Sequence, residues 1–215
     1  MNLTQELVLE FGRLGIVYVH LIACCVAIGL VLKSDVAMVK DMLKGDRASE
    51  LAHMKQMKGL QSTVAIALVA LWATGAAIVT LDALSKGGWQ YFANPKLQAK
   101  ILIVVLLTLN GVVLHNLVLP WLQKAGSMMN LTFDKTVLAT FAGTVSGVSW
   151  LYAAMLGVGR PLAWKYSLGQ LLAAYPLMIA GGFISMMALI LWCRQRTNPS
   201  ARSEAATFAR VSAGS

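Results

Sequence analysis

Two histidines stand in long uncharged stretches of this 215-residue chain, where their imidazoles could ligate a metal. His20 lies in the uncharged run 14–32, and His115 lies in the uncharged run 101–123. A haem b held between helices takes one imidazole from each side, and the second nitrogen of each ring is hydrogen-bonded. The two residues therefore form one candidate cofactor site, with haem b as its ligand.

The depth of the two histidines decides whether one iron could bind both. At 1.5 Å per helical residue, His20 lies about 9 Å and His115 about 21 Å from the same side of the membrane. The mismatch of about 12 Å is too large for one iron unless the helices are strongly staggered. The alternative interpretation is structural, with each histidine hydrogen-bonded across helices.

Methionines beside a third histidine offer a second candidate site. His53, Met54 and Met57 precede the uncharged run 59–81. Thioethers and imidazole suit Cu(I), and residues three or four apart on a helix can share a face. The segment therefore predicts a copper site, and the alternative is that the methionines fill irregular apolar grooves.

Other polar side chains inside the uncharged runs include Asn110, Ser146, Ser149 and Tyr175. Polar groups are costly in a bilayer, so each of them is a candidate for ligand binding. The runs contain no Asp, Glu, Lys or Arg, which argues against a proton pump or a carboxylate-driven antiporter. Without an acid, no Ser/His/Asp set can be assembled, and we do not expect a hydrolytic or nucleophilic enzyme.

The composition indicates the environment of these side chains. Of the residues, 58% are hydrophobic and 13% are charged, whereas soluble domains carry about 25% charged residues. The mean hydropathy is +0.68. These values argue against a water-soluble globule and indicate the lipid bilayer as a partner.

Five uncharged runs are long enough to cross a bilayer as helices. Such a helix needs about 20 mostly apolar residues, because its backbone must satisfy its own hydrogen bonds there. We therefore predict an all-α polytopic membrane protein, with a five-helix transmembrane domain at 1–196 and a disordered cytoplasmic tail at 197–215. The runs are 14–32, 59–81, 101–123, 136–159 and 166–193.

The distribution of positive charge predicts the orientation. The formal net charge is +9, and most Lys and Arg residues lie in segment 33–58, in segment 124–135 and in the tail. The positive-inside rule places these parts in the cytoplasm, with the N-terminus outside and the C-terminus inside. Because topology explains the excess charge, we expect an inner-membrane location and no nucleic-acid partner.

Prolines and capping residues predict where helices begin and bend. Asn94 followed by Pro95 is typical of a helix start, and Ser167 opens a capping box. Pro176 removes a backbone donor inside the last run and predicts a kink there. Pro120 either kinks the third helix or marks its end.

Small residues and one long connection predict packing surfaces. Ala139, Gly143 and Gly147 recur every four residues, which lets helix backbones approach closely. Their partner is either another helix of this chain, a second copy or another membrane protein. Segment 33–58 mixes apolar and charged residues, so we expect helical extensions broken near Gly45 that lie on the bilayer surface or on a partner.

The motifs of three segments resemble those of known membrane proteins. The stretches NPKLQAKILIVVLLTLNGVVLHNLVLP, LWATG and SWLYAAMLGVGRPL resemble a poorly characterised group of bacterial multi-pass inner-membrane proteins. The placement of His20 and His115 is similar to that in copper-resistance D-type and cytochrome b561-like membrane proteins. That second resemblance implies that His20 and His115 are haem ligands.

These observations predict an integral inner-membrane protein with an accessory or scaffolding role, or with a binding site for a small ligand or a soft metal. The ligand site would use His20, Asn110 and His115, with His53 and Met57 as further candidates. The alternative is a b-type haem cytochrome that uses the intramembrane histidines for electron transfer.

Overall fold

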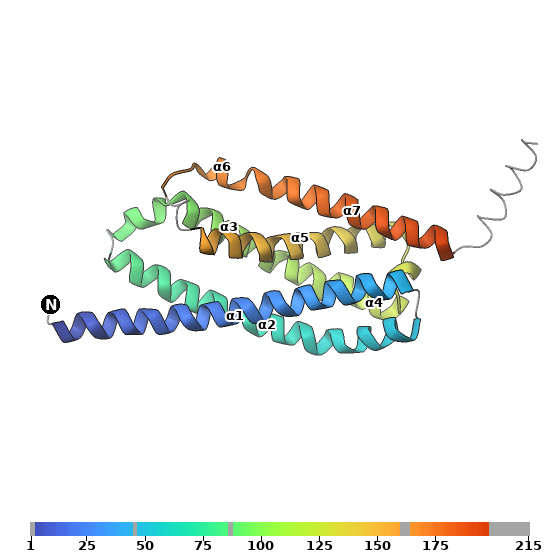
Figure 1. Ribbon diagram of the computed structural model, residues 1–215, viewed down its shortest axis with the longest axis horizontal. Helices are drawn as coiled ribbons and strands as arrows, with labels where there is room; N and C mark the ends of the chain where they lie inside the picture. Colours follow the sequence, from blue (N-terminus) through green and yellow to red (C-terminus); the bar gives the residue numbers. More distant parts are fainter. Residues whose placement is uncertain (1–2, 45–46, 86–87, 160–163, 198–215) are drawn as a thin grey trace, which may run out of the picture.

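The protein is seen here in a computed structural model, which describes residues 3–44, 47–85, 88–159 and 164–197. Within these ranges all regular structure is helical (Figure 1). The longer helices are α1 (Leu3–Lys44), α2 (Arg47–Ser85), α3 (Pro95–Val113), α4 (Leu119–Ala125), α5 (Phe133–Val158), α6 (Leu168–Leu172) and α7 (Ala174–Thr197). Short helical turns are η1 (Gly88–Ala93), the π-helical η2 (Leu114–Val118) and η3 (Met128–Asn130).

Five helical stretches within the described ranges are long and apolar enough to cross a membrane. Each contains all or most of one predicted run, so the all-α class and the five spans are confirmed. Large apolar side chains such as Ile66, Leu109 and Leu177 stay exposed on the outside of the bundle, as lipid-facing positions do. The stretches are Glu10–Lys44, Gly59–Ser85, Pro95–Ala125, Phe133–Val158 and Leu168–Arg196.

The helices form two groups that lie side by side. Helices α1 and α2 make an antiparallel hairpin, and α3, α5 and α7 form the other group (Figure 1). The start of α1 and the end of α7 lie at opposite ends of the long axis. We call the end where α1 leads into α2 the Asp35 end, and the end where α2 leads into η1 the Asp82 end.

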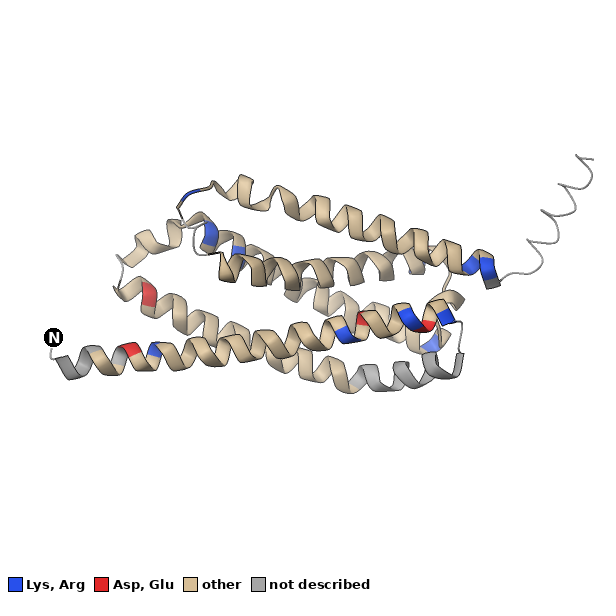
Figure 2. Ribbon diagram, in the orientation of Figure 1, with Lys and Arg blue, Asp and Glu red and all other residues tan. Residues whose placement is uncertain are grey.

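The charged residues gather toward the two ends of the bundle, and the middle of the helices is free of them (Figure 2). Helix α1 has 42 residues, so it is about 63 Å long. A hydrocarbon core is only about 30 Å thick. The helix therefore extends beyond the hydrocarbon core, and residues before and after its uncharged run 14–32 also belong to it.

Local sequence signals explain several helix ends. The side chain of Asn94 accepts a hydrogen bond from the backbone N–H of Lys96 at 3.0 Å, and Pro95 is the first residue of α3. Ser167 and Gln170 form the reciprocal hydrogen bonds of a capping box at the start of α6. Both predicted helix starts are confirmed, because these contacts depend on neighbouring residues alone.

The two intramembrane prolines act differently. Pro176 cannot donate to the carbonyl of Leu172, and the fifth span is interrupted at Ala173, between α6 and α7. Pro120 does not end its helix, which continues through α4. Just before this proline the chain widens into the π-helical turn η2, where the N–H of Leu119 donates to a carbonyl five residues back.

Three clusters of buried side chains follow one another along the bundle. The middle cluster joins α1, α2, α3 and α5 through Ala27, Ala67, Leu107 and Trp150. The end cluster lies at the Asp35 end and includes Met42, Val118, Leu122, Met128 and Ile190. The third cluster packs α3, α5, α6 and α7 together through Ala99, Ile103, Tyr152, Leu156, Leu171 and Tyr175.

Candidate functional site

A pocket of about 500 Å³ lies between the hairpin and the second helix group. Its wall is mostly aliphatic and comes from α1, α2, α5 and the continuous helix formed by α3, η2 and α4. Pockets of 300–1,000 Å³ with an apolar wall and a few polar groups are typical of small-molecule sites. The polar side chains near one level of this wall are Ser34, Asp35, Gln61, His115, Asn116 and Ser146.

Helix register places these polar groups at a similar level. Asp35 follows Ala27 of the middle cluster by eight residues along α1, which is about 12 Å. His115 follows Leu107 of the same cluster by eight residues along α3 and η2. Gln61 precedes the cluster's member on the antiparallel α2 by six residues, which is about 9 Å. A polar belt therefore lies between the apolar middle cluster and the apolar end cluster.

Asp35 is the acidic residue of this belt. Its side chain is half-buried, and its Oδ2 atom is 3.5 Å from the position that a Cβ on Gly147 of α5 would take. Because that distance is an ordinary van der Waals contact, the carboxylate lies directly beside Gly147 of α5. No side chain that the structure describes forms a hydrogen bond or an ion pair with Asp35.

The pocket opens sideways between α2 and α3. Val69 of α2 and Val112 of α3 both line it, and they are 69% and 54% exposed. On the side of the middle cluster, Trp72 Nε1 donates to Thr108 Oγ1 at 3.1 Å and ties the two helices together. Because Val69 and Val112 are exposed and aliphatic, this part of the opening faces the region where lipid chains would lie.

The π-helical turn shapes the α3 side of the pocket. His115 and Asn116 lie in η2, line the pocket and remain exposed at its opening. A π-helical turn inserts an extra residue into a helix and occurs frequently at functional sites. Here the turn carries both polar side chains of α3–η2 that belong to the belt.

The structure does not bring the two predicted haem ligands to one level. His20 Nδ1 lies 2.8 Å from Thr74 Oγ1, so this histidine joins α1 to α2. It precedes Asp35 by fifteen residues, or about 22 Å along α1. His115 lies near the level of Asp35, so the two imidazoles are not placed to share an iron, and haem binding stays a prediction without geometric support.

The predicted copper ligands lie in α2, but their side chains are outside the described part of the structure. These residues are His53, Met54 and Met57. Among the residues that are described, no group of three or more His, Cys, Asp and Glu side chains is placed to hold a metal ion. The copper site is therefore a prediction that the structure does not test.

Three other predicted polar residues connect helices. Asn110 Nδ2 donates to the carbonyl of Ala142 at 2.8 Å and links α3 to α5. The hydroxyls of Ser149 and Tyr175 are 2.8 Å apart and link α5 to α7. Both hydroxyls are buried, and none of these three polar residues lines the pocket. Their contacts are those of helix packing.

The small-residue face of α5 points inward. Gly143 lines the pocket, where a Cβ would meet open space, and Gly147 faces Asp35 of α1. The two glycines thus create space within one chain. Docking of a second copy or another membrane protein on this face stays a prediction.

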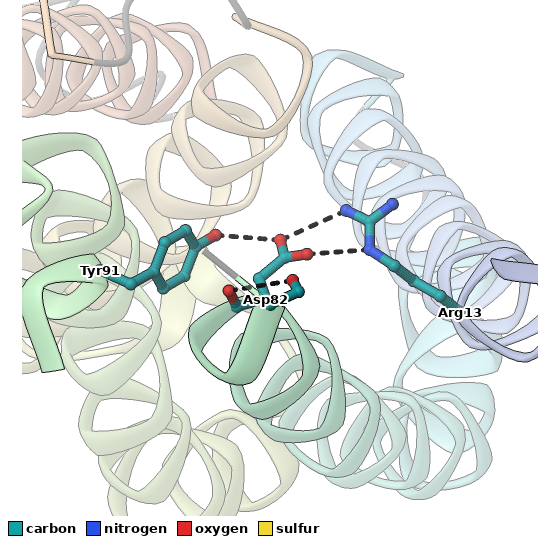
Figure 3. Close-up of polar contacts among 4 residues, drawn as sticks. Arg13, Asp82 and Tyr91 are labelled. Atoms are coloured by element: carbon teal, nitrogen blue, oxygen red, sulfur yellow. Dashed lines mark hydrogen bonds and ion pairs between the residues drawn. The ribbon is translucent and has the colours of Figure 1, made fainter. Parts of the chain in front are cut away.

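A polar cluster at the Asp82 end was missed by the sequence analysis (Figure 3). Asp82 is 5% exposed, and its carboxylate accepts hydrogen bonds from Arg13 Nε at 2.9 Å and from Arg13 Nη2 at 3.3 Å. The Tyr91 hydroxyl donates to the same carboxylate at 3.1 Å. Burial, together with the charge of Asp82, raises the pKa of Tyr91 above its ordinary value of 10.0.

Two acids that lie just outside the uncharged runs are thus buried or half-buried within the bundle. Asp82 directly follows the uncharged run 59–81, and Asp35 comes shortly after 14–32. A helix continues past the end of an uncharged run, so a flanking charge can still be buried between helices. The pairing had a signal in the sequence, because Arg13 and Asp82 flank the same ends of two neighbouring antiparallel runs.

Comparison with family models, curated proteins and solved structures found no match to this chain. The resemblances to bacterial multi-pass proteins and to haem-binding membrane proteins stay predictions. The geometry of the pocket is therefore the feature that indicates a function.

Proposed function

We propose that this chain is an integral membrane protein that binds a small amphipathic molecule in the pocket beside Asp35. The observation that carries the proposal is the combination of an aliphatic wall, a volume of about 500 Å³ and a belt of polar side chains. Sites for small molecules combine a mostly apolar surface with a few placed polar groups. This pocket has both.

The ligand's two parts have different places in the pocket. Its apolar part lies against Leu68, Leu107 and Trp150, which line the side nearer the middle of the bundle. Its polar part lies at the belt, where neutral hydrogen-bonding groups and one carboxylate are available. The bound molecule thereby satisfies groups that would otherwise lack partners in a mostly apolar wall.

The bilayer is the route by which the ligand enters. The end cluster supplies buried pocket residues Val118, Leu122 and Met128, which close the Asp35 end. The opening between α2 and α3 faces sideways, past exposed aliphatic side chains. An amphipathic molecule that already resides in the membrane reaches this opening without crossing water.

The proposed orientation places the pocket in the cytoplasmic half of an inner membrane. Basic residues lie near the ends of the helices that reach the Asp35 end, which supports a cytoplasmic position for that end. They are Lys40 and Lys44 of α1, Lys124 of α4 and Arg194 of α7. Figure 2 shows positive charges gathered at this end of the bundle. The N-terminus is then outside. The ligand is therefore taken from the inner leaflet.

The test is binding of a small neutral apolar dye, N-phenyl-1-naphthylamine, to the protein in lipid nanodiscs, with empty nanodiscs as the baseline. Gly143→Leu places a side chain in the open space of the pocket. We expect at least tenfold weaker binding, because the leucine occupies ligand volume.

The matched control is Gly181→Leu, an exposed glycine of α7 where a Cβ also meets open space. This variant should bind the dye like the unchanged protein. Equal affinity of the Gly143→Leu variant and the unchanged protein would show that the dye does not occupy this pocket, and the proposal would be wrong.

A further inference from the structure

The lining of the pocket contains only two titratable side chains, Asp35 and His115, within the described residues. The other polar side chains of the belt are neutral hydroxyls and amides. Among the residues that the structure describes, no Lys or Arg lines the pocket. Within this described lining, the carboxylate of Asp35 is therefore the group that can carry a negative charge.

The other buried acid, Asp82, forms an ion pair with Arg13 of the same chain. Asp82 has the guanidinium of Arg13 and the hydroxyl of Tyr91. Asp35 receives no hydrogen bond and no ion pair from any side chain that the structure describes. A half-buried carboxylate beside an aliphatic wall is unfavourable unless a cation or a donor accompanies it.

The position of Asp35 suits a charge carried by a bound molecule. Its Oδ2 atom lies beside Gly147 of α5, a residue that has no side chain to cover it. Ser34 and Gln61 line the same pocket and offer oxygens to the N–H groups of an amine. A cationic head at this level leaves its apolar groups against the middle cluster.

We propose that the pocket selects lipophilic cations, that is, molecules in which an ammonium or similar positive centre is attached to apolar groups. Asp35 is the residue that binds the positive centre. The inference rests on the proposed function, because it specifies the chemical class of the ligand for the same pocket. The volume of about 500 Å³ limits that class to small molecules.

The experiment measures tetraphenylphosphonium with an ion-selective electrode, against protein in nanodiscs of neutral phosphatidylcholine. Neutral lipid removes the attraction of the cation to an anionic membrane surface. Tetraphenylborate serves as the anion of matched shape. The neutral dye N-phenyl-1-naphthylamine is measured on the same samples.

Asp35→Asn keeps the shape of the side chain and removes its charge. We expect tetraphenylphosphonium to bind this variant at least tenfold more weakly than the unchanged protein. The affinity for the neutral dye should change less than twofold, which also shows that the variant is folded. Asp134→Asn removes an exposed acid outside the pocket lining and should leave both affinities unchanged.

The outcomes separate the two proposals. If the cation binds the Asp35→Asn variant as well as the unchanged protein, or if tetraphenylborate binds as tightly as the cation, charge selection by Asp35 is overturned. The proposed function still stands in that case, provided that Gly143→Leu abolishes dye binding. If neither the cation nor the dye binds the unchanged protein, the proposed function fails and the inference fails with it.

Discussion

Asp82 and Asp35 lie on the two helices of one hairpin, near opposite ends, and their carboxylates have different surroundings. Asp82 is almost fully buried and has Arg13 and Tyr91 as partners. Asp35 is half-buried, lines a pocket and has no partner among the described side chains. Asp82 joins α1, α2 and η1 in one contact. Asp35 instead lines a pocket.

The surroundings explain the difference. At the Asp82 end, the cation of α1 and the phenol of η1 both reach the acid of α2, so three elements meet at one carboxylate. At the Asp35 end, Gly143 and Gly147 remove side chains from the face of α5, and the π-helical turn alters the neighbouring helix. The pocket beside Asp35 remains open because these two glycines of α5 have no side chains to fill it.

Replacing each acid by alanine should give the largest difference in the free energy of unfolding between the two regions. Asp82→Ala should lower the free energy of unfolding by about 2 kcal/mol, since an ion pair and a hydrogen bond are lost and Arg13 can regain water. Asp35→Ala should change it by less than about 0.5 kcal/mol or increase it, because no partner is lost. Chemical unfolding in detergent micelles measures both values.

The neutral variant Asp134→Asn, on an exposed site, controls for the loss of one negative charge. A loss of stability in Asp35→Ala as large as that in Asp82→Ala would contradict the comparison. It would mean that Asp35 has a structural role like that of Asp82.

The phenol of Tyr91 should account for a smaller part of the contact at the Asp82 end. Tyr91→Phe removes one hydrogen bond to a charged acceptor while Arg13 stays in place, so we expect a loss of about 1 kcal/mol. The same unfolding assay measures it. Tyr166→Phe, at an exposed tyrosine with no side-chain hydrogen bond among the described residues, should have no effect.

If the phenylalanine variant is as stable as the unchanged protein, the Arg13 pair alone holds the acid. The contact between η1 and the hairpin would then depend on apolar packing.

The smallest expected effect concerns pH. The pKa of Tyr91 is raised by burial and by the charge of Asp82, so the folded state holds the phenolic proton more tightly than the unfolded state. This contribution to stability is complete below pH 10 and is lost as the pH rises through the raised pKa. Asp82→Asn removes the second cause, so the Tyr91 pKa should fall toward 10.0 but stay above it.

A near-ultraviolet absorbance titration follows the ionisation, and the Tyr91→Phe variant identifies the signal. A Tyr91 pKa that does not change in Asp82→Asn would show that burial alone raises it.

Much of the fold could be predicted from the sequence because its signals are local. The uncharged runs predicted the five helices, and Asn94 and Ser167 predicted two helix starts. Pro176 predicted a kink in a span that the structure interrupts at Ala173. Each of these depends on apolar length, on a hydrogen bond to a near neighbour or on a missing backbone donor. Pro120 was less clear, since a proline can end a helix or be accommodated within one, as it is beside η2.

The candidate site could be predicted only in part. His115 was chosen for its place in an uncharged run, and it does line the pocket. Asp35 could not be found by the same reasoning, because it follows an uncharged run and does not lie within one. Asn110, Ser149 and Tyr175 were chosen by the same reasoning as His115, yet each of them connects helices.

By itself the sequence determined that this chain is a bundle of apolar helices, where several of them begin, and which polar side chains they carry. The tertiary structure decided which of those side chains meet. Arg13 reaches Asp82, His20 reaches Thr74, and Asp35 faces Gly147 beside a pocket. Apolar length and helix caps act within a few residues, whereas these meetings depend on the register and spacing of helices far apart in the chain.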